Sequence, residues 1–179
     1  MKELKKAAFF DRDGTLIEDV GYLRALDQIS FIQPMIDIAQ LCQTMGYSLF
    51  VVTNQSGVAR GFFDEAFVQK THQFLTMLLR QKGIFIQDFY YCPHHPDSGL
   101  GDYRRVCSCR KPAPGLLLQA AADYSLDLSQ SLLFGDASRD IEAGKAAGCK
   151  SFLMQDLLQK TLQEVAKEIF IGTIEDSVR

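Results

Sequence analysis

Apolar and polar residues alternate along this chain in blocks of two kinds. Short apolar runs of strand length occur at residues 7–10, 47–52, 85–91, 131–134 and 151–154. Longer segments with apolar residues at helical spacing lie between and after them, at residues 34–45, 64–82, 114–124, 139–147 and 157–169. Strands that alternate with helices predict an α/β fold, in which a central parallel sheet is covered on both faces.

The segment 64–82 shows the helical pattern most clearly. Asp64 can cap the first turn, and Gly83 follows the last turn, where glycine is favoured. The apolar stripe of this segment consists of Phe67, Val68, Thr71, Phe74, Leu75, Leu78 and Leu79. His72 lies in the middle of the helix without a partner motif, so we interpret it as a surface or packing residue.

Polar clusters follow three of the apolar runs, at residues 11–15, 53–57 and 135–140. The carboxyl ends of parallel strands share one edge of the sheet, and ligands bind at that edge. The three clusters are therefore predicted to meet in one site, to which Asp140 adds a further acid. An isolated Asp-x-Asp-Gly segment is also an ordinary turn, so the functional interpretation depends on all three clusters together.

The residue types in these clusters suit phosphoryl transfer. Asp11 offers a carboxylate nucleophile, and Asp13 can donate a proton to the leaving alcohol and later accept one from water. Attack by a carboxylate on an anionic phosphate needs a cation, and Mg²⁺ prefers oxygen ligands such as Asp11 and Asp136. Thr53 and Lys111 are predicted to hold the phosphoryl oxygens.

Composition narrows the class of protein. The 179 residues suit a single domain of ordinary size, and 47% hydrophobic with 23% charged residues is typical of a soluble globular protein. No apolar run is long enough for a signal-peptide core or a membrane span. The net charge of -3 indicates no nucleic-acid partner. We expect one cytoplasmic, monomeric domain over residues 1–179 that acts on a small molecule.

A second group of candidate ligands lies in the long connection after the third apolar run. Cys92 and His94 are separated by one residue, as are Cys107 and Cys109. Three sulfurs and one nitrogen match a closed tetrahedral zinc site, although each pair is closer in sequence than is usual. His95 competes with His94 as the fourth ligand. The alternative is that these are ordinary buried thiols and a loop histidine.

Zinc in this loop, residues 92–109, would have a structural role. The connection is too long to lack any organising element, and a metal would stiffen it. It would also hold Arg110 and Lys111 beside the phosphate. The remaining cysteines, Cys42 and Cys149, are predicted to be small buried hydrophobic residues.

Four ordered motifs resemble those of the haloacid dehalogenase superfamily of phosphatases. They read FFDRDGT, VVTN, RKP and FGD, and the resemblance covers residues 7–154. It implies a three-layer Rossmann-like fold and a phosphoaspartate on Asp11. It also implies that the backbone carbonyl of Asp13 joins Asp11 and Asp136 as a magnesium ligand. Only short loops follow Asp11 and precede Arg110, so no separate cap domain is expected.

Longer segments look like the D-glycero-D-manno-heptose-1,7-bisphosphate 7-phosphatase family: DRDGTLIEDVGYL, TNQSGVARG, CPHHP, CSCRKPAPG and GDASRDIEAG. This resemblance implies removal of the 7-phosphate from the heptose bisphosphate, on the route to ADP-heptose and the lipopolysaccharide core. It favours His94 over His95 as the zinc ligand. The substrate contacts that it implies are Asp19, Val20, Gly21, Tyr22, Thr53, Asn54, Gln55, Ser56, Arg110 and Lys111. The chain departs from the family at Ala137, where Lys is frequent.

Three other functions account for part of the pattern. Histidinol-phosphate phosphatases share the motifs and a similar zinc loop, but they usually carry an acidic residue at the place of Ser56. A polynucleotide 3′-phosphatase would share the Asp-x-Asp-Gly-Thr motif and has no need of the zinc loop. A zinc-stabilised phosphate-binding module without catalysis would have no chemical use for both Asp11 and Asp13.

Overall fold

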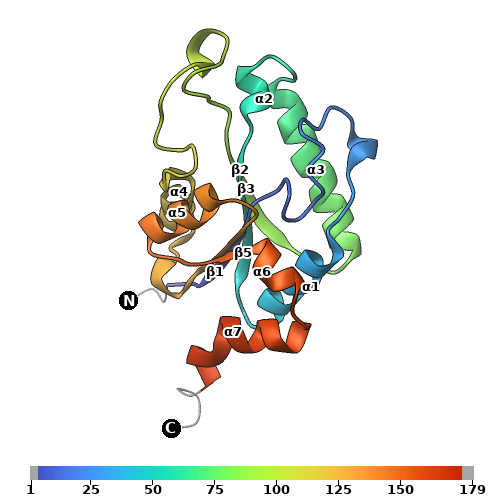
Figure 1. Ribbon diagram of the computed structural model, residues 1–179, viewed down its shortest axis with the longest axis vertical. Helices are drawn as coiled ribbons and strands as arrows, with labels where there is room; N and C mark the ends of the chain where they lie inside the picture. The colour runs from blue at the N-terminus through green and yellow to red at the C-terminus, as the bar shows by residue number, and fades with distance from the viewer. Residues whose placement is uncertain (1–3, 175–179) are drawn as a thin grey trace.

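A computed structural model describes residues 4–174, with side chains described as far as Phe170. The two ends of the predicted domain, 1–179, lie outside these residues. Figure 1 shows a central sheet with helices on both sides. The sheet has five parallel strands in the order β3-β2-β1-β4-β5. The strands are β1 (Ala7–Phe10), β2 (Ser48–Asn54), β3 (Ile86–Cys92), β4 (Leu132–Gly135) and β5 (Lys150–Leu153).

Helices form the two outer layers. One face of the sheet is covered by α1 (Gln33–Thr44), α3 (Glu65–Gln81), α6 (Met154–Leu158) and α7 (Leu162–Ile174), and the other by α4 (Gly115–Tyr124) and α5 (Ser138–Ala147). The short α2 (Ser56–Ala59) follows β2 directly. Single 3-10 turns occur at Leu26–Gln28, Gly101–Tyr103 and Leu128–Gln130. Within residues 4–174, no helix is both long enough and apolar enough to cross a membrane.

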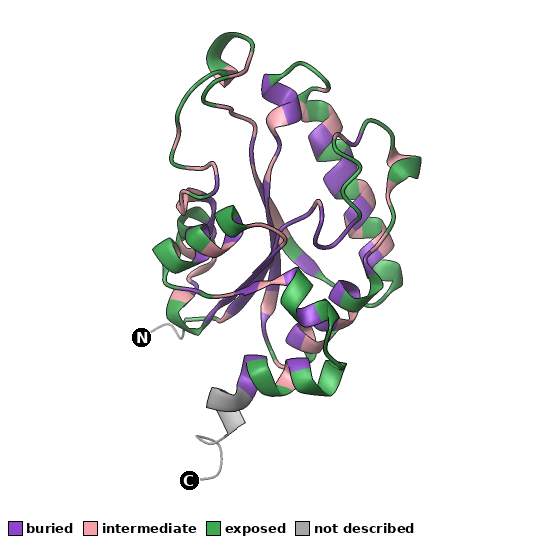
Figure 2. Ribbon diagram, viewed as in Figure 1, coloured by how far each residue is buried: buried purple, intermediate pink, exposed green. Residues whose placement is uncertain are grey.

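The two faces of the sheet carry separate hydrophobic cores. Along β1, Ala8 and Phe10 pack into the core under α1, whereas Ala7 and Phe9 pack into the core under α4. All four residues are fully buried, as expected for a parallel strand covered on both sides. Figure 2 shows the same arrangement, with buried residues along the strands and exposed residues on the outer sides of the helices. The α/β fold predicted from the sequence is confirmed.

The predicted strands and helices occur close to their expected bounds, with one exception. Residues 157–169 were expected to form one helix, but they belong to α6 and α7, which are separated by a short break. At this break the hydroxyl and backbone N–H of Thr161 both donate to Glu164 Oε2, at 2.7 and 2.8 Å. The Thr-x-x-Glu segment is a capping box, which starts a new helix, and this sequence signal was missed.

Helix α3 confirms its predicted cap and most of its predicted stripe, in which four residues are buried and three are half-buried. The backbone N–H of Phe67 donates to Asp64 Oδ1 at 2.8 Å. His72 is packed rather than exposed, because only 7% of its surface is accessible and its ring stacks on Phe89 with the centroids 4.6 Å apart. Of the two possibilities considered for His72, the structure supports packing.

Candidate active site

The three polar segments that follow β1, β2 and β4 lie at one edge of the sheet, as predicted. A cleft of about 320 Å³ opens at this edge. Ten of its lining residues belong to the predicted site: Asp11, Asp13, Asp19, Gly21, Tyr22, Thr53, Asn54, Gln55, Ser56 and Arg110. Its other lining residues are Arg12, Leu23, Gly57, Phe63 and Arg139. The fold therefore brings most of the predicted substrate contacts to one place.

The floor of the cleft is a buried cluster of charges. Lys111 Nζ lies 3.0 Å from Asp11 Oδ1 and 2.6 Å from Asp140 Oδ1, and it donates to the Val52 carbonyl at 2.8 Å. These three partners match the three protons of the ammonium group. Lys111 is therefore held next to the predicted nucleophile, beneath the cleft rather than on its wall.

Asp136 brings a further carboxylate to this floor. Its Oδ1 atom is buried and has no hydrogen-bond partner within residues 4–174, and the Arg139 guanidinium is 3.7 Å away. Carboxylate oxygens of Asp11, Asp136 and Asp140 all lie within 4.8 Å of one another. Three carboxylates around the single ammonium group of Lys111 leave an excess of negative charge, which a divalent cation would balance.

Asp140 is already engaged by the protein on both of its oxygens. Oδ1 faces Lys111, and Oδ2 accepts the backbone N–H of Ala137 at 3.1 Å. Asp11 and Asp136 are therefore the carboxylates that could hold magnesium, in agreement with the predicted pair. Gly14 permits the approach of Asp136, because Gly14 has a φ of 76° and a Cβ atom there would lie 2.6 Å from Asp136 Oδ2.

Burial makes the ionised carboxylates costly while no cation is bound. It raises the pKa of Asp11 to about 6, with Asp140 and Asp13 adding to the shift and Lys111 opposing it. Burial also raises the pKa of Asp136. Each shift means that the ionised form costs folding free energy. A cation bound between Asp11 and Asp136 would offset that cost, so the electrostatics agree with the ligand geometry.

Asp13 lies on the wall of the cleft, where its side chain is 26% exposed, compared with 5% for Asp11. Arg12 Nε donates to both carboxylate oxygens of Asp13 at 3.1 Å, and Gln55 Nε2 donates to Asp13 Oδ2 at 2.8 Å. The same Gln55 nitrogen donates to Thr53 Oγ1 at 2.7 Å. Because the Thr53 hydroxyl accepts this bond, its own proton remains available to a ligand.

Asn54 connects the end of β2 to the segment that carries Lys111. Asn54 Nδ2 donates to the Lys111 carbonyl and Asn54 Oδ1 accepts the Lys111 N–H, both at 3.0 Å. Its amide is therefore occupied by the backbone, although the residue lines the cleft. Arg110 lines the cleft as well, and its Nη1 donates to the His94 carbonyl at 3.1 Å.

The loop after the nucleophile contributes unequally to the cleft. Asp19, Gly21 and Tyr22 line it, and Asp19 Oδ1 orders the turn by accepting the Gly21 N–H at 2.8 Å. The Tyr22 ring packs edge-on against Phe62 with the centroids 4.6 Å apart. Val20 does not line the cleft and is 46% exposed. A contact of the Val20 side chain with substrate remains a prediction.

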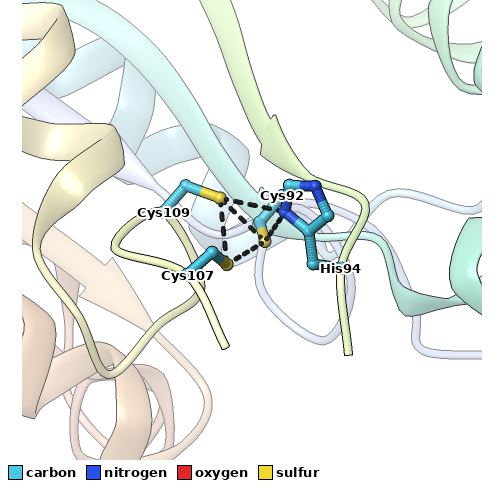
Figure 3. Close-up of side chains that lie close together, drawn as sticks. All are labelled: Cys92, His94, Cys107 and Cys109. Atoms are coloured by element: carbon cyan, nitrogen blue, oxygen red, sulfur yellow. Dashed lines mark hydrogen bonds between the residues drawn. The ribbon is translucent and has the colours of Figure 1, made fainter. Parts of the chain in front are cut away.

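The four predicted zinc ligands converge in the loop after β3. Figure 3 shows the three sulfurs of Cys92, Cys107 and Cys109 facing His94 Nδ1. The sulfurs are 3.1 to 3.5 Å apart, and His94 Nδ1 is 3.4 Å from Cys109 Sγ. A Zn–S bond of about 2.3 Å places the sulfurs of a tetrahedral site about 3.8 Å apart. The cluster fits zinc after an outward shift of a few tenths of an ångström.

His95 has other partners, so the structure favours His94 as the fourth ligand. His95 Nδ1 accepts the backbone N–H groups of Asp97 and Ser98, at 3.2 and 3.1 Å. Cys42 and Cys149 lie outside the cluster and are buried, as predicted.

Comparison with known proteins agrees with this geometry. A family model of HAD-like hydrolases matches residues 108–163. A D-glycero-beta-D-manno-heptose-1,7-bisphosphate 7-phosphatase from Pasteurella multocida is 45% identical over 152 residues, which are 84% of this chain and 82% of the relative. The chain belongs to this phosphatase family. A relative of the same name from Photorhabdus laumondii is 38% identical over 95% of this chain and 92% of its own length.

A solved structure of the family has the same fold. The D,D-heptose 1,7-bisphosphate phosphatase from B. bronchiseptica, complexed with magnesium and phosphate, has a TM-score of 0.73 with 30% identity. The match covers 88% of this chain and 87% of that one. The family membership predicted from the motifs is thus confirmed, and this chain is a phosphatase of the HAD superfamily.

Two charged residues of this site, Arg139 and Arg12, were not predicted from the sequence. Asp140 was predicted as a further acid of the site, but without a role of its own. Arg139 lines the cleft near Ala137, and its side chain is 46% exposed. Arg12 stands between the two acidic residues of the first motif, yet it is 2% exposed. Nothing in the local sequence indicates that this arginine is buried.

Proposed function

We propose that this chain removes the 7-phosphate of D-glycero-D-manno-heptose 1,7-bisphosphate, and that it prefers the beta anomer named for its relatives. The observation that carries this proposal is the placement of Asp11 at the floor and Asp13 on the wall of one cleft, in a chain of this family. The product would enter the route to ADP-heptose.

The first step transfers the phosphoryl group to the protein. Asp11 attacks phosphorus while the bond to the ester oxygen breaks, and Asp13 gives its proton to that oxygen. Thr53 holds a phosphoryl oxygen, and the ammonium group of Lys111 holds another once it exchanges one of its three protein partners for the substrate. In the second step Asp13 takes a proton from water, the water oxygen bonds to phosphorus, and the bond to Asp11 breaks. Inorganic phosphate leaves, and both carboxylates return to their starting state.

Magnesium bound by Asp11, Asp136 and the Asp13 carbonyl would offset the repulsion between the carboxylate and the phosphate. The supporting observation is the unpartnered, buried Oδ1 atom of Asp136, within the residues that the structure describes. Zinc bound by Cys92, His94, Cys107 and Cys109 would have a structural role, since four protein ligands close its shell.

Cleft residues would contact the substrate at both of its phosphorylated ends. In this proposal the remaining contacts come from the cleft residues Asp19, Gly21, Tyr22, Asn54, Gln55, Ser56 and Arg110, and from Val20 in the same loop as Asp19. Arg139 supplies a further cation on the side where Ala137 offers none. The half-buried Arg110 and the exposed Arg139 together suit a substrate with two phosphate groups.

A substrate panel tests this function. We would measure phosphate release from both anomers of the heptose bisphosphate, from histidinol phosphate and from a 3′-phosphorylated oligonucleotide, all with magnesium. We expect the highest kcat/KM for the beta anomer, with heptose 1-phosphate as the product seen by ³¹P NMR. A higher kcat/KM for histidinol phosphate would replace the proposed substrate. Absence of turnover on the whole panel would instead support a non-catalytic phosphate-binding module.

We also propose that residues 1–179 form a single phosphatase domain with its zinc loop at 92–109, active as a cytoplasmic monomer without nucleic-acid or membrane partners. The net charge of -3 supports the exclusion of nucleic acid. Light scattering on the purified protein measures the oligomeric state, and a mass of two chains would contradict the monomer.

A further inference from the structure

Arg12 is a buried cation that the mechanism above does not use. It exposes 2% of its surface, and a buried guanidinium needs both charge compensation and hydrogen-bond acceptors. Its compensation comes from Asp13, whose Oδ1 accepts from both Nε and Nη2 of Arg12 at 3.1 Å. A planar fork that contacts a carboxylate in this way fixes the orientation of the carboxylate as well as its position.

The same guanidinium has partners on its other side. Arg12 Nη2 donates to Gln55 Oε1 at 2.8 Å, and Gln55 in turn donates to Asp13 Oδ2 and to Thr53 Oγ1. Arg12, Asp13 and Gln55 therefore form a closed ring of hydrogen bonds. Two residues with predicted roles in the reaction, Asp13 and Thr53, are joined through this ring.

The ring is anchored to the protein core through His72. Arg12 Nη1 lies 3.5 Å from His72 Nε2. Burial, with a further contribution from the charge of Arg12, lowers the pKa of His72 to about 3, so the imidazole is neutral and can accept from the guanidinium. The imidazole of His72 stacks on Phe89 of β3 and packs edge-on against Tyr91. The support for Arg12 thus comes from α3 and β3.

We propose that Arg12 is a positioning residue, which holds the carboxylate of Asp13 in the orientation needed for proton transfer. This inference rests on the proposed function, since it assigns Asp13 the acid and base roles. Asp13 is exposed on the cleft side and contacted by Arg12 and Gln55 on the other side. Arg12 Nε shares its one proton between the two oxygens of Asp13, and the side chain is 26% exposed, so the transferred proton can reach the carboxylate from the cleft.

The proposal has a consequence that a purely structural role for Arg12 lacks. An alkyl phosphate needs a proton from Asp13 on its departing oxygen, whereas p-nitrophenolate leaves as a stable anion without one. Misplacing Asp13 should therefore slow transfer of the phosphoryl group from an alkyl ester far more than from p-nitrophenyl phosphate. General acid catalysis contributes roughly a hundredfold to ten-thousandfold, which sets the size of the effect.

The test compares Arg12→Met with the parent in rapid-mixing experiments. Methionine keeps most of the buried volume and removes every donor. The rate constant for formation of the phosphoenzyme is measured with p-nitrophenyl phosphate and with a simple alkyl phosphate such as glycerol phosphate. We expect the loss with the alkyl ester to exceed the loss with the aryl ester by at least about tenfold. In an Asp13→Asn background, Arg12→Met should not change this ratio further.

Two further variants keep the result interpretable. Arg80→Met removes an arginine exposed on α3, the helix that carries His72, and should leave both rate constants unchanged. If Arg12→Met does not fold, Arg12→Lys replaces it, because lysine keeps the charge but cannot contact the carboxylate with a planar fork. Equal losses with the two esters would overturn the positioning role while leaving the phosphatase function intact. A parent protein that transfers phosphate from neither ester would instead contradict the proposed function.

Discussion

The cleft and the zinc loop both gather metal-ligand side chains, but they differ in what surrounds those side chains. The floor of the cleft is built on strand ends, and Asp11 and Lys111 are buried there. The loop has little core of its own, since Leu100 is 67% and Val106 is 86% exposed. We therefore expect the cleft to keep its shape without a metal, and the loop to depend on zinc for a defined conformation.

The two regions meet at one short segment. Lys111 follows Cys109 by two residues, yet its ammonium group is part of the buried charge cluster. The backbone of Lys111 is hydrogen-bonded to the side chain of Asn54 at the end of β2. The side chain of Arg110 donates a hydrogen bond to the His94 carbonyl. A substitution that disturbs the loop should therefore also lower the activity, whereas a substitution in the cleft should lower the activity without unfolding the protein. Four experiments examine this difference.

The largest effect is expected for Asp11→Asn, which cannot form a phosphoaspartate. We expect kcat to fall by more than about a thousandfold, as is typical when a covalent nucleophile is removed. The melting temperature of the metal-free variant should be no lower than that of the parent, because burial raises the pKa of Asp11 to about 6 and its ionised form costs folding free energy. Circular dichroism measures the fold, and Asp156→Asn on the exposed side of α6 is the matched control. A tenth of the parent rate in Asp11→Asn would exclude Asp11 as the nucleophile.

Mild chelation separates the two metals. Activity should fall to the background rate and return on addition of Mg²⁺, because magnesium keeps water ligands and exchanges readily. Zinc should stay bound throughout, since three thiolates and an imidazole close its shell. Elemental analysis by mass spectrometry follows each metal beside the activity. Recovery of activity with Zn²⁺ in the absence of Mg²⁺ would contradict this assignment.

Cys107→Ser tests the coupling from the loop to the cleft. Loss of a thiolate should release zinc, lower the melting temperature and reduce kcat/KM by about a hundredfold, the cost of a displacement of about 1 Å at a positioning residue. Cys149→Ala removes a thiol outside the cluster and should keep its zinc. If Cys107→Ser loses zinc while its kinetics and melting temperature match those of the parent, the loop does not support Arg110 and Lys111.

The smallest effect concerns the imidazole beneath the cleft. His72 has a pKa of about 3 in the fold and 6.5 when unperturbed, so the unfolded chain takes up its proton first as the pH falls. The stability that depends on neutral His72 is complete above pH 6.5 and is lost toward pH 3. From about pH 8 down to pH 5, this loss lowers the free energy of unfolding by about 2 kcal/mol. Unfolding in urea gives the free energy of unfolding of the parent and of His72→Gln at both pH values. The difference between the two proteins should change by that amount between the two pH values. A difference that does not vary with pH would contradict the prediction.

Much of this protein follows from its sequence alone. Apolar runs of strand length and helices at regular spacing determine a parallel sheet, and polar segments directly after β1, β2 and β4 must then share one edge. The convergence of Asp11, Asp13 and Asp136, and that of the four candidate zinc ligands, could be predicted because their positions depend on strand ends and on local spacing. The break between α6 and α7 was also present in the sequence, as a Thr-x-x-Glu cap.

The tertiary structure decided what no local pattern carries. Arg12 has the sequence surroundings of an exposed turn residue, yet it is buried because Asp13, Gln55 and His72 from three separate segments surround it. Asn54 is occupied by the backbone of Lys111, and Asp140 by its ammonium group. Each outcome depends on contacts between residues far apart in the chain. The cost of burying a charge is set by all of its neighbours at once, and only the folded chain brings those neighbours together.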